Sequence, residues 1–81
     1  MSHADRILMG PGPGNPYPEV MEAFSRPVIG HLDPDFIALL DETNDRLRQV
    51  FRTANPLTFP VSATGSAGME ATFVNVLGPG D

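Results

Sequence analysis

A run of small and hydroxyl-bearing residues, Ala63 to Gly68, lies between an apolar stretch and a pattern of helical period. The first amides of a helix have no backbone partner and carry the positive end of the helix dipole, so a helix start can bind an anion, above all phosphate. Gly65 leaves such amides uncovered, and the hydroxyls of Thr64 and Ser66 can donate further hydrogen bonds. These residue types therefore suit a phosphate site.

A helix cap explains the same residues, because Ser and Thr are common first residues of a helix. The spacing alone leaves the cap and the phosphate site both open. The run lacks the Gly-Lys-Ser/Thr of a P-loop, and Gly65 with Gly68 does not make the dinucleotide-binding fingerprint. A phosphate site here would be of another kind.

A second candidate is the Gly/Pro-rich arm from Met9 to Val20. Its four prolines lack amide donors and restrict the residues before them, so the arm cannot be regular structure. The composition is that of a plain linker or of an arm that contributes to a site, and it does not distinguish them.

The remaining titratable candidates have structural explanations. His31 is a lone histidine, for which a solvated or structural role is favoured over a place in an active site. Asp33 and Asp35 flank Pro34 and are expected to cap a helix and balance its dipole. Because no His or Cys completes a ligand set with them, no metal site is predicted.

Three helices and one strand are predicted to position these residues. A short helix covers about Pro18 to Phe24, and an amphipathic helix covers about Pro34 to Thr53, with one apolar stripe opposite a charged face. Residues 57–62 are β-prone and are predicted to form a short strand, and residues 66–77 return to helical spacing. The small-residue run thus becomes a strand-to-helix turn.

Composition limits the class of protein. The 81 residues have a net charge of −5, and their five basic residues are scattered arginines, so no nucleic-acid or anionic-membrane surface is expected. No apolar run approaches the roughly 18 residues of a membrane span, and the sequence does not start like a signal peptide, so a cytoplasmic location is expected. Cysteine is absent, and a chain of this length is marginally stable by itself.

Several motifs, weak singly, together resemble one enzyme family. The stretches "GPGPGNPYPEVMEAFSRPVIGHLDPDF" and "LRQVFRTANPLTFPVSATGSAGMEATFVNVLGPGD" are similar to the amino-terminal part of the class V pyridoxal-phosphate (PLP) aminotransferases. The branch is that of the alanine–glyoxylate, serine–glyoxylate and serine–pyruvate aminotransferases. The resemblance runs from about Ile7 to Asp81, with the pieces in family order and at family spacing.

The resemblance implies an α/β fold class, of which this chain would supply an incomplete part. Residues 1–33 would form the amino-terminal arm with its short helix, and residues 34–81 the amphipathic helix and the first strand-turn-helix of the PLP-binding large domain. The family's substrate arm corresponds to Gly10, Pro11 and Gly12, near the substrate carboxylate. The residues that bind the cofactor phosphate correspond to Thr64, Gly65 and Ser66, which favours that role over a plain cap.

The activity implied is transamination from a small amino acid, of alanine or serine type, to glyoxylate or another 2-oxo acid. The lysine that binds PLP covalently, the aspartate at its ring nitrogen and the arginine for the substrate carboxylate lie downstream of the matched part in this family. The sequence has no lysine. We therefore expect a fragment of a homodimeric enzyme that contains no catalytic residue and is inactive alone.

Two alternatives stay open beside this interpretation. Another class V enzyme, such as a cysteine desulfurase or a phosphoserine aminotransferase, has a related arm and turn with different residues. A small non-enzymatic module could use the same helix start for a generic anion and the apolar stripe for a partner. The identity of the amino donor also stays open, because its pocket lies largely outside this stretch.

Overall fold

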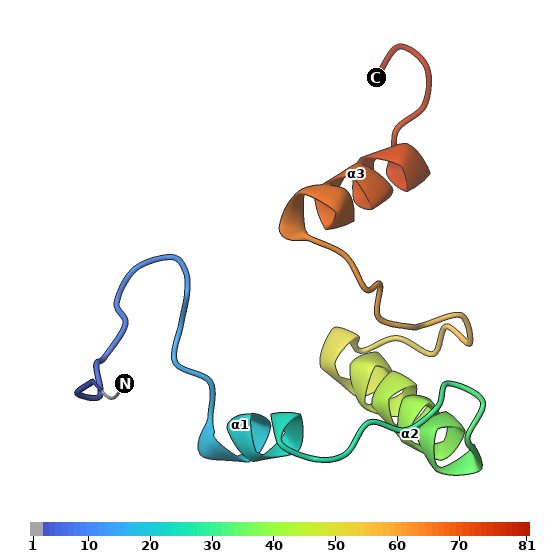
Figure 1. The fold of residues 1–81 in the computed structure, drawn as a ribbon. Coiled ribbons are helices and arrows are strands. Elements are labelled where there is room, and N and C mark those ends of the chain that lie inside the picture. The colour runs from blue at the N-terminus through green and yellow to red at the C-terminus, as the bar shows by residue number, and fades with distance from the viewer. Residues whose placement is uncertain (1–2) are drawn as a thin grey trace.

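The computed structural model describes residues 3–81, which form three helices joined by irregular segments (Figure 1). The helices are α1 (Pro18–Phe24), α2 (Pro34–Phe51) and α3 (Gly65–Val76). No two of them pack against each other within residues 3–81, and no side chain of that range is fully buried. The radius of gyration is 17.1 Å, whereas a compact domain of this length has about 12 Å. This part of the chain has no core of its own.

Helix α2 has strong local signals at both ends. Asp33 accepts a hydrogen bond from the amide of Asp35 at 2.8 Å, and Pro34 takes the first helical position. At the other end Arg52 adopts a left-handed conformation with φ 52°, and the amide of Thr53 bonds back to the carbonyl of Arg48 at 3.0 Å. The predicted helix is confirmed, but it ends at Phe51 because this left-handed residue closes it.

Arg48 ties the segment after α2 back onto the helix. Its guanidinium donates to the carbonyls of Asn55 at 2.9 Å and Pro56 at 2.6 Å, and it pairs with Asp45 at 2.6 Å. The Arg48 side chain is 25% exposed, while its partner's side chain is 69% exposed. The segment that leads toward the small-residue turn is therefore fixed at its start by a side chain of α2.

The strand predicted over residues 57–62 is not confirmed, and neither is the α/β class. No strand occurs within residues 3–81, and these residues have no regular secondary structure. A strand is defined by its ladder to a neighbour, and the described residues contain no second extended segment paired with this one. The structure of this chain is helical.

The other two helices agree with the sequence pattern. Helix α1 has the predicted bounds, with Pro18 at its first position. Helix α3 begins at Gly65 and ends at Val76, one residue earlier at each end than predicted. No helix within the described residues is both long and apolar enough to cross a membrane.

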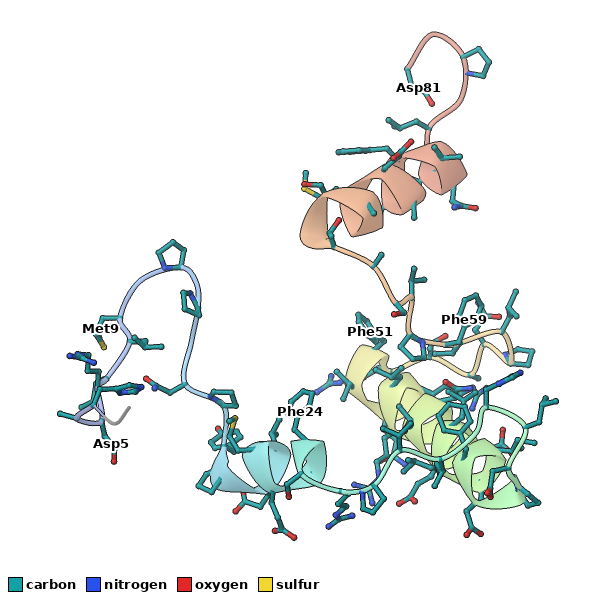
Figure 2. The ribbon with its side chains drawn as sticks, in the orientation of Figure 1. Asp5, Met9, Phe24, Phe51, Phe59 and Asp81 are labelled. Carbon is teal, nitrogen blue, oxygen red and sulfur yellow. The ribbon has the colours of Figure 1, made fainter. Side chains whose placement is uncertain are left out.

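Large apolar side chains are exposed on all three helices (Figure 2). Phe24 on α1 is 81% exposed, Phe51 on α2 is 73% exposed and Val74 on α3 is 74% exposed. The apolar stripe of α2 is present, but nothing within residues 3–81 covers it fully. A stable form of this chain requires further surface to bury these groups.

Candidate functional site

Thr64 starts helix α3 abruptly. Its backbone is extended, at φ −69° and ψ 164°, and its hydroxyl oxygen accepts a hydrogen bond from the amide of Ala67 at 3.2 Å. Its carbonyl accepts from the amide of Gly68 at 2.9 Å. Thr64 is therefore the N-cap residue, and its hydroxyl proton is left to donate elsewhere.

Three consecutive amides lie at this helix start without a partner. Within residues 3–81, the amides of Thr64, Gly65 and Ser66 donate no hydrogen bond, and the Ser66 hydroxyl makes none. The sequence predicted these free amides. The hydroxyl oxygen of the cap residue Thr64 accepts from the amide of Ala67, which follows them. Capping and a free donor set are thus present together, because a helix start has more orphan amides than one side chain can satisfy.

The charge at this helix start also differs from that of the other two helices. Helix α1 has Glu19 in its first turn and α2 has Asp35, whereas α3 has no acidic residue there. The positive end of the α3 dipole is consequently not balanced by a carboxylate of its own first turn. This arrangement favours an anion supplied from outside the helix.

Gly65 is not required by the backbone or by packing within this chain. It lies in the helix without a positive φ, and a Cβ built on it meets no heavy atom within 4 Å. A glycine usually marks a strained backbone angle or a close neighbour. Here the space beside Gly65 is open, as a group bound to the three amides would need.

The Gly/Pro arm forms an open loop far from α3. Figure 1 shows the arm in blue at one end of the molecule and α3 in red at the other. Gly10 and Gly12 are exposed, and a Cβ on either glycine meets no atom of the described residues within 4 Å. The structure therefore does not bring Gly10, Pro11 and Gly12 near Thr64, Gly65 and Ser66.

The remaining candidates have the structural roles expected of them or none. Asp33 caps α2 through the amide of Asp35. His31 is exposed in the turn before α2, and its side chain makes no hydrogen bond within residues 3–81. No cluster of three or more potential metal-binding side chains occurs among the described residues.

Two side chains that the sequence did not single out organise the loops. Asn15 bonds to Leu8 and Arg6 across the arm, and Arg48 bonds to two carbonyls after α2. An Asn after a glycine is a common turn signal, but bonds that span seven to nine residues cannot be recognised from spacing.

Comparison with known proteins finds relatives of this chain among enzymes that are considerably longer. No family model matches the chain. The alanine–glyoxylate aminotransferase of Rattus norvegicus is 42% identical over 81 residues, which is 100% of this chain and 20% of that protein. The Drosophila melanogaster enzyme of the same name is 41% identical over 76 residues. The (S)-ureidoglycine–glyoxylate transaminase of Bacillus subtilis is 40% identical over 76 residues, 94% of this chain and 18% of that protein.

A solved structure agrees with these relatives. The crystal structure of an alanine–glyoxylate aminotransferase from Nostoc sp. matches all of this chain with a TM-score of 0.84 and 51% sequence identity, over 22% of its own length. The chain thus spans about a fifth of the length of the proteins that it matches. The resemblance inferred from the arm, the turn and their spacing is confirmed: this chain is a homologue of one segment of the alanine–glyoxylate aminotransferases.

Proposed function

We propose that this chain is the cofactor-phosphate and substrate-arm segment of a PLP-dependent aminotransferase that uses glyoxylate or another 2-oxo acid as amino acceptor. The observation that carries the proposal is the set of three unpartnered amides at Thr64, Gly65 and Ser66 beside an open glycine. The relatives support it, because their names are those of glyoxylate transaminases. They differ in the amino donor that they name, so the donor stays open between alanine, serine and other small amino acids.

The donor set fits the phosphate of PLP. A phosphate ester has several strong acceptor oxygens and close to two negative charges, and it is bound well by grouped amides at a helix start. The amides at 64–66 and the hydroxyls of Thr64 and Ser66 are free to donate, so a phosphate can be bound at the start of α3. When bound, PLP supplies an electron sink for the carbanion that forms at the α-carbon of the amino acid.

The arm would act on the substrate side. Gly10 and Gly12 have no side chains, so this part of the arm can lie close to a substrate without filling the pocket. The separation of the arm from the end of α3 favours a homodimer in which the arm serves the site of the other subunit (Figure 1).

The α/β fold belongs to this proposal as well. Residues 57–62 would pair with strands supplied by the rest of such an enzyme, and residues 34–81 would begin its PLP-binding domain after the arm region 1–33. The cytoplasmic location stays a prediction. A cysteine desulfurase, a phosphoserine aminotransferase or a non-enzymatic anion-binding module is less well supported, since the relatives named above are glyoxylate transaminases.

A chimeric enzyme tests the proposal directly. Residues 1–81 would replace the matching segment of the Nostoc sp. enzyme, which is 51% identical over this stretch. We expect the chimera to bind PLP and to transfer the amino group of alanine to glyoxylate, with the unmodified enzyme as control. A chimera that is folded and dimeric but shows no detectable binding of PLP would refute the proposal.

A further inference from the structure

The Gly/Pro arm is closed at its base by one side chain. The Oδ1 atom of Asn15 accepts a hydrogen bond from the amide of Leu8 at 2.6 Å, and its Nδ2 atom donates to the carbonyl of Arg6 at 3.1 Å. The two bonds span seven and nine residues and enclose the loop Met9–Gly14. Asn15 is thus the link that joins the two ends of the arm loop.

No other hydrogen bond shapes this loop. None of the residues Met9 to Gly14 donates or accepts one within the described part of the chain. The loop has three glycines, which are the most flexible residues, and no atom of residues 3–81 lies within 4 Å of a Cβ built on any of them. Without the Asn15 bonds, only the fixed φ angles of two prolines would limit the conformations of the loop.

The chemistry of this link requires a carboxamide of this length. The amide of Leu8 needs an acceptor and the carbonyl of Arg6 needs a donor, and the Asn side chain presents both in one plane. Aspartate has the same shape but only acceptors when ionised, so it would keep the bond to Leu8 and repel the Arg6 carbonyl. Alanine would keep neither bond.

We propose that Asn15 is a positioning residue that holds Gly10, Pro11 and Gly12 in the conformation in which they meet the substrate. This rests on the proposed function, which gives the arm its substrate-side role. Because the phosphate-binding amides belong to a distant part of the chain (Figure 1), loss of the Asn15 bonds should weaken the binding of the amino acid without weakening that of PLP.

The test uses the chimeric enzyme described above with Asn15→Ala and Asn15→Asp. The matched control is Asn75→Ala, because Asn75 also donates its Nδ2 to a backbone carbonyl, that of Ala71 at 2.7 Å, on an exposed part of α3. We expect Asn15→Ala to raise the KM for the amino acid about five- to a hundred-and-fiftyfold, the range that follows from the loss of two hydrogen bonds. We expect kcat and the Kd for PLP to stay within about twofold of the parent. The KM of Asn15→Asp should lie between those of the parent and Asn15→Ala, and this variant tests the loop if the alanine variant does not fold.

Hydrogen exchange of the Leu8 amide provides a readout that does not depend on activity. We expect it to be slow in the parent chimera, faster in Asn15→Ala, and unchanged in the control. Equal exchange in the parent and Asn15→Ala, an unchanged KM, or a parallel loss of PLP affinity would each overturn the proposal. If the parent chimera binds PLP but transfers no amino group, the proposed function fails, and the Leu8 exchange still decides whether Asn15 sets the arm.

Discussion

Gly65 provides the sharpest test of the phosphate site, because the structure removes the usual reasons for a glycine. Its helical backbone accepts any L-residue, and a Cβ on it meets no atom of residues 3–81 within 4 Å. If α3 begins with a plain cap, Gly65→Ala should be neutral or stabilise the helix by at most about 1 kcal/mol. If a phosphate lies against the amides at 64–66, a side chain at this position occupies the same space.

The expected losses differ between the two residues that line this space. Ser66→Ala removes at most one hydroxyl bond to a charged group, about 1.5–3 kcal/mol, so PLP affinity should fall roughly ten- to a hundredfold. Gly65→Val crowds the phosphate away from more than one amide, and the loss of two such bonds is about 3–6 kcal/mol, or at least a hundredfold. Valine should therefore weaken PLP binding more than the serine substitution does.

Equilibrium dialysis of the chimeric enzyme against PLP measures both variants, with circular dichroism to check folding. Gly68→Ala is a matched control, because a Cβ there also meets no atom within 4 Å but its amide is already bonded to the carbonyl of Thr64. It should bind PLP like the parent. A folded Gly65→Val variant with the parent's affinity would show that residues 64–66 only cap the helix.

Four further predictions concern stability and reactivity. Arg52→Gly should stabilise the chimera by up to about 1 kcal/mol in denaturant unfolding, because a glycine adopts the φ of 52° without strain; a loss of stability would contradict this. Asp33→Ala should cost about 0.5–2 kcal/mol in the same assay, since it removes the bond to the Asp35 amide. The isolated chain should melt without a cooperative transition in circular dichroism, because no described side chain is buried. Mixed with PLP and borohydride, it should form no side-chain adduct by mass spectrometry, since it has no lysine; an adduct at the α-amino group would not count.

The features that could be predicted from the sequence are those determined within a few residues. Asp33 and Pro34 start α2 through a bond to the second residue along, and the free amides at Thr64–Ser66 follow from the geometry of any helix start. The β-prone pattern of residues 57–62 predicted a strand that the structure does not contain. A strand forms only beside a partner strand, and residues 3–81 do not supply one.

The loop contacts were missed for a different reason. Asn15 reaches Arg6 and Leu8, and Arg48 reaches Asn55 and Pro56, only because the intervening chain turns back. Their residue types are equally consistent with solvated side chains, so spacing carries no signal for them. The Asn15 bonds nevertheless close the arm, and the Arg48 bonds fix the start of the segment that leads to Thr64.

The absence of a core and the close structural match have a common explanation under the proposed function. The radius of gyration is 17.1 Å and no two helices within residues 3–81 pack together, so this is not a stable globule. The chain nevertheless matches part of a solved enzyme over its whole length, with a TM-score of 0.84. Under the proposed function, the open arrangement is that of a segment that packs against other parts of a larger enzyme. In such an arrangement the apolar stripe of α2 lacks a packing surface and the amides at the start of α3 lack an acceptor for one reason. The packing surface would belong to the remaining four fifths of the enzyme, and the acceptor to its cofactor. Substitutions at the stripe should then change the stability of the chimera, whereas substitutions at Gly65 should change its PLP affinity with folding intact.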